Sequence, residues 1–156
     1  MDIEFRMANE DDAKTIGELV IKLTEEICIR TNTQHFEIDL PNTIRRCRDL
    51  IHDNHYGAII GYSDNKPIAI ATFTESYALY AGGKVGIMPE FYVDPNFRSS
   101  GIGEKLLAHI KNYGRENGWS CIELCTPPLP EFERTLLFYQ KNGLVPVGGR
   151  KMRQQI

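Results

Sequence analysis

Residues 90–107, with the sequence EFYVDPNFRSSGIGEKLL, are the most informative part of this chain for its expected fold. It predicts the end of a strand, a turn at Asp94-Pro95-Asn96, and a glycine-bearing loop that opens an amphipathic helix. Amide groups at a helix N-terminus are unpaired and carry about half a positive charge, so they bind phosphate. Gly101 and Gly103 let the backbone approach an anion with no Cβ in the way. Arg98 can add a charge-assisted hydrogen bond.

Two common phosphate-binding patterns do not fit this loop. The dinucleotide fingerprint G-x-G-x-x-G fails because Leu106 occupies the third glycine position. The P-loop fails because no Gly-Lys-Ser/Thr sequence is present. The pattern that does match is Arg-x-x-Gly-x-Gly, at Arg98–Gly103.

The rest of the chain predicts alternating helices and strands. The expected strands cover residues 3–7, 57–62, 67–74, 85–93, 120–126 and 144–152, the last with a kink at Gly148-Gly149. Helices are expected from Asn9 to about residue 28, from Pro41 to about residue 53, within residues 98–117, and over 131–141, with a loop at 30–37. This order predicts a layered α+β (α/β) fold in one domain, residues 1–156.

The composition is that of an ordinary globular protein, with 42% hydrophobic and 25% charged residues. The net charge of −3 argues against a nucleic-acid binder that works through bulk positive charge, although local basic patches stay open. No apolar run approaches the roughly 18–20 residues that cross a bilayer, and the start lacks the features of a signal peptide. We therefore expect neither a nucleic-acid nor a membrane partner.

The positions of the cysteines and histidines predict neither a disulfide bond nor a metal site. Cys28, Cys47, Cys121 and Cys125 form no C-x-x-C pair, and we interpret them as reduced, mostly buried thiols of a cytoplasmic protein. The four histidines show no ligand spacing, so no metal site is expected.

Residues 98–103, preceded by a strand that ends in Val93-Asp94-Pro95, resemble the pyrophosphate-binding motif of the GNAT superfamily of N-acetyltransferases. A second block, LFYQKNGL at 137–144, resembles the FYxKxGF ending of the last helix in that family, with Leu144 in place of the frequent phenylalanine. The first strand and helix also fit, so the resemblance covers essentially the whole chain. Its specific motifs lie in residues 90–144.

The resemblance implies a mixed sheet of about six to seven strands with about four helices, in which the fourth and fifth strands splay apart. These would be residues 85–93 and 120–126. Pro89 inside the first of them and Pro127-Pro128 after the second fit such an irregularity. Homodimers are common among such domains, and we carry a homodimer as an expectation.

The implied reaction is direct transfer of an acetyl group from acetyl-CoA to an amine. The cofactor-binding residues would be the backbone of Phe91, Tyr92 and Val93 for the pantetheine arm and thioester, and the amides of Arg98, Ser99, Ser100, Gly101, Ile102 and Gly103 for the pyrophosphate. Glu90 is the candidate base that neutralises the amine, although a solvated or substrate-binding role stays open. Tyr139 is the candidate acid for the departing thiolate, with simple packing as its alternative.

The sequence says least about the amine that accepts the acetyl group. Glu75, Tyr77, Tyr80, Glu131 and Glu133 suit a small cationic amine, while a protein lysine or N-terminus stays open. Two other classes of function compete with an enzyme: a non-catalytic acyl-CoA-binding sensor, and a nucleotide-phosphate binder that uses the same loop.

Overall fold

The computed structural model describes residues 2–34 and 39–156, which divide into two compact units. The larger unit ends at Cys125 and holds β1 (Ile3–Met7), α1 (Ala13–Thr31), α2 (Leu40–His52), β2 (Gly57–Ser63), β3 (Lys66–Ala78), β4 (Gly83–Ile87), β5 (Phe91–Val93), α3 (Ile102–Glu116) and β6 (Cys121–Glu123). The smaller unit, Thr126–Ile156, holds α4 (Glu133–Lys141). None of the described helices combines the length and apolar character that a membrane span needs.

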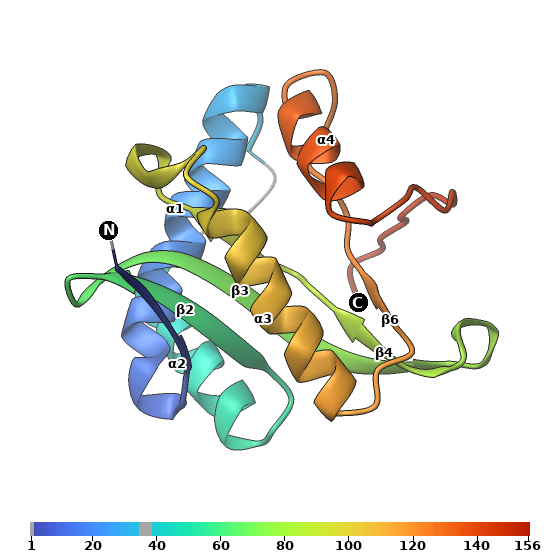
Figure 1. The fold of residues 1–156 in the computed structure, drawn as a ribbon, viewed down its shortest axis with the longest axis horizontal. Coiled ribbons are helices and arrows are strands. Elements are labelled where there is room, and N and C mark those ends of the chain that lie inside the picture. The colour runs from blue at the N-terminus through green and yellow to red at the C-terminus, as the bar shows by residue number, and fades with distance from the viewer. Residues whose placement is uncertain (1, 35–38) are drawn as a thin grey trace. The chain divides into compact units, whose positions relative to one another are not determined.

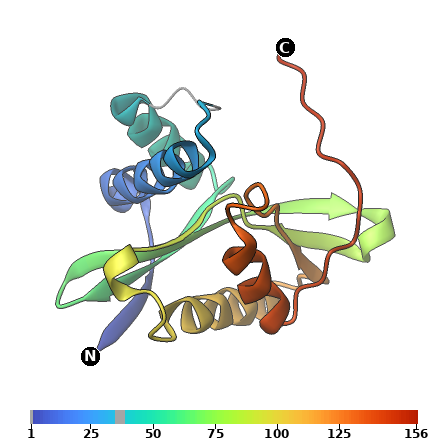
Figure 2. The same cartoon turned by 90° about the horizontal axis from the view of Figure 1, so that it is seen from above.

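The sheet of the larger unit is mixed, as the sequence predicts. Its order is β1-β2-β3-β4-β6. β5 also pairs with β3, at residues 69–71, whereas β4 pairs with residues 74–78 of β3. Every pairing is antiparallel except the parallel one between β4 and β6. Figures 1 and 2 show that α1 and α2 cover one face of the sheet and α3 crosses the other. The α+β class with its layered arrangement is therefore confirmed.

The α1/α2 face carries a continuous apolar core. The residues of α1, α2, the sheet and β5 that meet there are Ala13, Ile16, Leu19, Cys47, Ala58, Ile60, Ile70 and Tyr92. Strand residues two apart point to the same face, which is why Ala58 and Ile60 both contribute. Through Tyr92, this core packs β5 against α1 and α2.

The α3 face is closed by an apolar stripe and an aromatic cluster. Ile102, Leu106, Leu107 and Ile110 are each at most 2% exposed, as their helical spacing predicts. At the other end of α3, the ring centroids of Phe73, Tyr113 and Trp119 lie 4.5–5.6 Å apart. Trp119 Nε1 also donates a 2.7 Å hydrogen bond to Glu75 on β3.

Trp119 packs on two glycines, because any side chain at either position would occupy the space of its ring. A Cβ on Gly86 of β4 would lie 2.2 Å from the indole ring, and one on Gly114 of α3 would lie 2.5 Å from it. Trp119 was not predicted from the sequence as a key core residue. Its ring joins α3 to β4, and so fixes the helix whose opposite end carries the predicted anion loop.

Several boundaries differ from the predictions. The first helix begins after a short 3₁₀ turn at Glu10–Asp12 capped by Asn9, and it continues to Thr31, so part of the expected loop at 30–37 is helical. Residues 35–37 of that loop lie outside the described residues. The strand predicted at 85–93 is interrupted between Ile87 and Phe91, and the one predicted at 120–126 keeps only Cys121–Glu123.

The predicted last strand at 144–152 is wrong. No residue from 144 to 156 forms a strand. Gly148 and Gly149 have φ of 84° and 81°, which turns the backbone out of the extended conformation, and Pro146 has no amide hydrogen to donate to a ladder. The kink that the glycines suggested thus prevents the strand.

The contact between Gly114 and the indole predicts the effect of one added methyl group. Gly114→Ala should lower the free energy of unfolding in urea by about 1–3 kcal/mol, the usual cost of overpacking. Helix propensity alone would favour alanine by about 1 kcal/mol. The same change in a Trp119→Leu background should therefore stabilise the protein. An undiminished stability of Gly114→Ala in the presence of Trp119 would contradict the packing described.

Candidate functional site

One extra residue between β4 and β5 changes how the strand faces its neighbours. Ile87 lies opposite Thr74 on β3, so Phe91 would lie opposite Ile70 if the register continued. Instead Phe91 lies opposite Ala71. The segment 88–90 therefore contains a one-residue β-bulge, with Pro89 inside it.

The bulge determines which backbone groups of β5 reach its other edge. Glu90 O accepts from Thr72 N at 2.9 Å, and Asp94 N donates to Ile68 O at 2.8 Å. In an antiparallel pair, residues alternate between bonding the partner and pointing away. Tyr92 therefore bonds toward β3, while the amide and carbonyl groups of Phe91 and Val93 point to the opposite edge.

That edge has no strand beside it in the described part of the chain. β6 follows β4 through Ser120 N to Lys84 O (2.8 Å) and Met88 N to Glu123 O (3.0 Å). Beyond Met88 the two segments part, and β5 pairs with β3 alone. The expected splay between the fourth and fifth strands is thus observed as the end of their ladder at the bulge.

The loop after β5 forms a cluster of outward amides at the start of α3. Ser99 and Gly101 have φ of 66° and 82°, and Ser100 Oγ donates to Phe97 O at 2.6 Å, which holds the turn. Among the described residues, no acceptor takes the amide hydrogens of residues 99–104. The amide of Arg98 is different, because it donates to Pro95 O at 3.4 Å. A Cβ added to Gly101 would meet nothing within 4 Å, so the loop opens onto free space.

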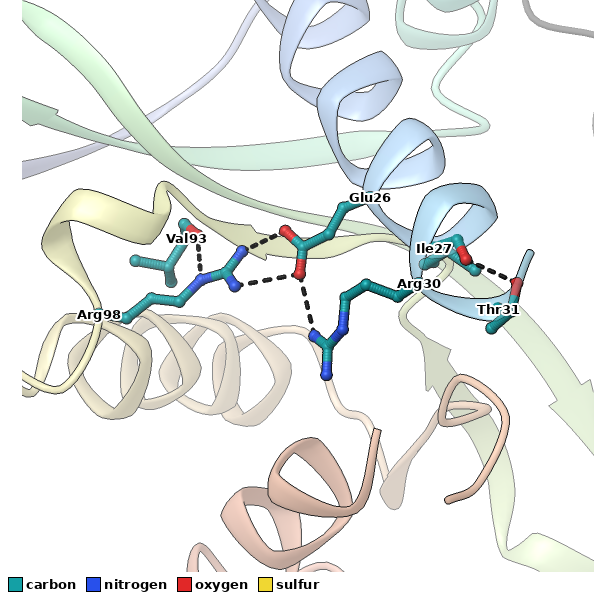
Figure 3. A network of polar contacts seen from close by, with 6 residues as sticks. All are labelled: Glu26, Ile27, Arg30, Thr31, Val93 and Arg98. Atoms are coloured by element: carbon teal, nitrogen blue, oxygen red, sulfur yellow. Dashed lines mark hydrogen bonds and ion pairs between the residues drawn. The ribbon is translucent and has the colours of Figure 1, made fainter. Parts of the chain in front are cut away.

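Figure 3 shows that the side chain of Arg98 faces a carboxylate of the same unit. Its two terminal nitrogens donate to Glu26 of α1 at 3.0 and 2.5 Å, and its Nε donates to Val93 O at 2.8 Å. Arg30, one turn further along α1, reaches the same carboxylate at 3.2 Å. Arg98 therefore joins the loop, the end of β5 and α1.

The charges of this network hold its members ionised. Burial alone would raise the pKa of Glu26, but the hydrogen bonds and charges of Arg98 and Arg30 bring that pKa below its usual value. The hydrogen bond from Arg98 to Glu26 likewise raises the pKa of the guanidinium, against a smaller opposing effect of burial. Glu26 lies 72 residues before Arg98, and no pattern in the sequence pointed to it.

Glu90 lies at the bulge, on the α1/α2 face, with two hydroxyl groups on one of its oxygens. Both Tyr56 Oη and Thr72 Oγ1 donate to Glu90 Oε1 in short hydrogen bonds. Thr72 Oγ1 in turn accepts from Glu90 N at 3.0 Å. Cys47 of α2 lies nearby, and its thiol pKa is raised to about 11, mainly by burial and then by the charge of Glu90. Glu90 was predicted from the sequence, whereas Tyr56 and Thr72 were not.

Tyr139 belongs to the smaller unit, in α4. It is 6% exposed, and its ring lies 5.2 Å from that of Phe138. Burial raises its pKa above the usual value, so it is a protonated phenol at neutral pH.

The cysteine thiols differ in their exposure. All four cysteines are free, but only Cys47 is buried, and Cys125 is exposed, which corrects the expectation of mostly buried thiols. Within the described residues, no group of three or more His, Cys, Asp or Glu side chains has the arrangement of a metal site.

Comparisons with known proteins match almost the whole chain. The family model described as acetyltransferase (GNAT) family matches residues 20–144. The uncharacterized N-acetyltransferase YhfO of Bacillus subtilis (strain 168) is 26% identical over 144 residues, which is 90% of this chain and 89% of that protein.

Solved structures show the same fold. A predicted acetyltransferase with acetyl-CoA from Clostridium acetobutylicum superposes with a TM-score of 0.79 at 16% identity, covering 98% of this chain and 96% of that one. The aminoglycoside N-acetyltransferase AAC(6')-Iy in complex with CoA gives a TM-score of 0.79 at 16% identity, covering 99% and 95% of the two chains.

The Glu26 network predicts a pH-dependent contribution to stability. Because the folded-state pKa of Glu26 is lowered, its stabilisation is present above the unfolded value of 4.5 and is lost as pH falls through the folded value. Glu26→Gln should cost about 1–2 kcal/mol at pH 7, a charged hydrogen bond reduced by partial exposure. Urea unfolding at pH 7 and at pH 3 should show the difference between variant and wild type shrinking at the lower pH. A difference independent of pH would contradict the ionic network.

Proposed function

The chain belongs to the acetyltransferase (GNAT) family, and on this premise we propose that it transfers the acetyl group of acetyl-CoA to a primary amine of a small molecule by direct attack. The observation that carries the proposal is the open edge of β5, which leads directly into the outward amides of residues 99–104. An extended arm that ends in a diphosphate needs these two features in this order.

The residues of the loop fit a diphosphate. Their amides have no acceptor within the described chain, and Gly101 leaves open the space that a side chain would fill. In this proposal the amides of Ser99, Ser100, Gly101, Ile102 and Gly103 bind the diphosphate. Arg98 acts differently from the expectation: its amide and guanidinium are already paired, so it supports the loop through Glu26 and Val93.

Fewer residues of β5 are available to pair with the cofactor than predicted. Tyr92 bonds toward β3, so the groups that can pair with a pantetheine arm are those of Phe91 and Val93. The carbonyl of Val93 is taken by Arg98. In this proposal an amide at this edge donates to the thioester oxygen as negative charge develops there. Acetyl-CoA itself would supply the activated acetyl group.

Glu90 is the proposed base and Tyr139 the proposed acid. An alkyl amine is mostly protonated near pH 7 and must lose a proton before it attacks, and a carboxylate beside the open edge can accept that proton. Tyr139 is assigned from its position in the block 137–144, and its protonated phenol can donate to the departing sulfur. Tyr92, whose hydroxyl pKa is also raised by burial, is paired through its backbone and is not assigned a proton-transfer role.

The acceptor is proposed to be a small, cationic amine. The proposal follows the small-molecule substrate named for an aminoglycoside acetyltransferase of similar fold, although a ribosomal-protein-alanine N-acetyltransferase has a similar fold as well. Of the residues expected to attract it, Tyr77 and Tyr80 are 75% and 85% exposed. Glu75 is already engaged by Trp119 Nε1 and by Lys84 at 3.8 Å, which weakens its candidacy.

Three expectations remain part of this proposal. The family model runs from residue 20 to residue 144 across both compact units, which supports one functional domain over 1–156. Four free thiols agree with a cytoplasmic enzyme. A homodimer stays a prediction.

The reaction is tested by the release of free CoA thiol in the presence of an amine panel. The wild type should release thiol only when an amine is present, with faster turnover for cationic polyamines, amino sugars and amino acid derivatives than for neutral or anionic amines. Tyr139→Phe should lower kcat by about 10²–10⁴-fold, the usual contribution of a general acid, while the acetyl-CoA affinity stays the same.

Other outcomes separate the competing classes. Binding of acetyl-CoA without turnover of any amine would identify a sensor. Stronger thermal stabilisation by ATP than by CoA would identify a nucleotide binder; a ligand at about 100 times its Kd adds roughly 2.7 kcal/mol. Undiminished turnover by Tyr139→Phe would remove Tyr139 from the mechanism.

The cofactor loop is tested separately by Gly103→Glu. A carboxylate among the amides should repel the diphosphate and weaken CoA binding by about 100-fold or more, which is about 2.7 kcal/mol or more. The fold should remain, because an acidic residue in the first turn of a helix is favourable. Titration calorimetry with CoA measures the affinity.

Two matched variants separate charge from size. Gly103→Gln should lose less affinity than Gly103→Glu, and Gly103→Ala should lose least. Gly101 is less suitable, because its φ of 82° strains any replacement. A Gly103→Glu protein that binds CoA as the wild type does would refute the site.

A further inference from the structure

Tyr56 and Thr72 form a pair of hydroxyl groups around Glu90 that the proposed reaction does not yet use. Tyr56 precedes β2, Thr72 is in the middle of β3, and Glu90 is in the bulge, so three separate segments meet at one carboxylate. Thr72 is 0% exposed, whereas Glu90 is partly exposed. A buried threonine hydroxyl in a strand that is otherwise lined by Ile68, Ile70 and alanines needs a polar partner, and Glu90 is that partner.

The hydrogen atoms of the cluster can be assigned. Each hydroxyl has a single hydrogen, and the shortest contact of each is with Glu90 Oε1. Glu90 N donates to Thr72 Oγ1 at 3.0 Å, which fills a lone pair of that oxygen. Burial and the charge of Glu90 both raise the pKa of Tyr56, so its phenol stays protonated and acts as a donor. Oε1 is therefore saturated by two donors, and Oε2 has no partner among the described residues.

We propose that Tyr56 and Thr72 are positioning residues: their hydroxyls fix Oε1 of Glu90, so that Oε2 is the oxygen presented to the acceptor amine. This inference rests on the proposed function. The step is a proton transfer in which an N–H bond of the ammonium group breaks, an O–H bond forms at Oε2, and the neutral amine keeps the electron pair with which it attacks the acetyl carbonyl.

The bulge explains why the two hydroxyl groups that bond Glu90 belong to Thr72 of β3 and to Tyr56 before β2. It brings Glu90 into a bonded pair with Thr72, whereas the uninterrupted register would put Pro89 in that position. The side chains of directly opposed residues lie on the same face of a sheet, so Thr72 and Glu90 both face α1 and α2. Tyr56, which directly follows the turn at the end of α2, reaches them from that side.

The test measures steady-state kinetics of Tyr56→Phe, Thr72→Val and Thr72→Ser. Tyr56→Phe and Thr72→Val each remove one donor and should lower kcat by about 10-fold, the lower end for a hydrogen bond to a charged group. KM for acetyl-CoA should change by less than about twofold, because neither residue belongs to the loop or the β5 edge. Thr72→Ser keeps the hydroxyl and should restore most of the rate.

A double-mutant cycle shows whether the effect acts through Glu90. In a Glu90→Gln background, Tyr56→Phe should change kcat by less than about twofold, because no carboxylate remains to be positioned. Tyr62→Phe is the matched control: this tyrosine stacks against Arg6 on β1, with the guanidinium 3.8 Å from the ring centre, and its substitution should leave kcat unchanged. Thermal melting of every variant verifies that it is folded.

The outcomes distinguish this inference from the function on which it rests. No amine-dependent thiol release by the wild type overturns the proposed function and the positioning role together. An active wild type with unchanged kcat in Tyr56→Phe and Thr72→Val overturns the positioning role alone. Equal losses with and without Glu90, or a loss confined to KM for the amine, also overturn it.

Discussion

In a paired strand, each residue directs its amide and carbonyl to one side only, and successive residues alternate between the two sides. The proposed site depends on a single exception to that alternation. Between Ile87 and Phe91 the chain holds one residue more than β3 opposite it. Before this bulge the odd-numbered residues bond toward β3; after it, Glu90 and Tyr92 do. The shift ends the ladder with β6, turns Phe91 and Val93 to the open edge, and brings Glu90 onto Thr72. Backbone edge and carboxylate are thus consequences of the same insertion.

Charge holds the proposed anion loop to this strand. Arg98 contacts Val93 O through one nitrogen and Glu26 through the other two, so the loop, the end of β5 and α1 share one side chain. Only a planar guanidinium can satisfy a carboxylate in two places and a carbonyl in a third. The arginine of the R-x-x-G-x-G pattern is therefore structural in this chain. The glycines supply the opening, and the loop amides supply the positive potential.

The structural features that could be predicted from the sequence are local ones. The strand Ile3–Met7, the proline at the start of α2, the hairpin of β2 and β3, and the apolar stripe of α3 follow from periodicity and capping, and all are present. Contacts between distant segments were out of reach. Glu26 and Arg98 are 72 residues apart, and Tyr56 and Glu90 are 34 apart. Pro89 indicated an irregular strand, but the size and direction of a register shift depend on the partner strand. The wrong last strand shows the converse: the strand expected at 144–152 does not form, because two of its glycines have positive φ.

A strand edge without a neighbouring strand can pair with other chains, and the shortness of β5 limits that hazard. The strand has three residues, with Pro89 before it and Pro95 after it, and only Phe91 and Val93 turn their backbone outward. A foreign β-strand would find too few partners to hold a register, whereas a slender ligand arm needs no more than these. The protein thus keeps an opening in its sheet without becoming a template for edge-to-edge aggregation.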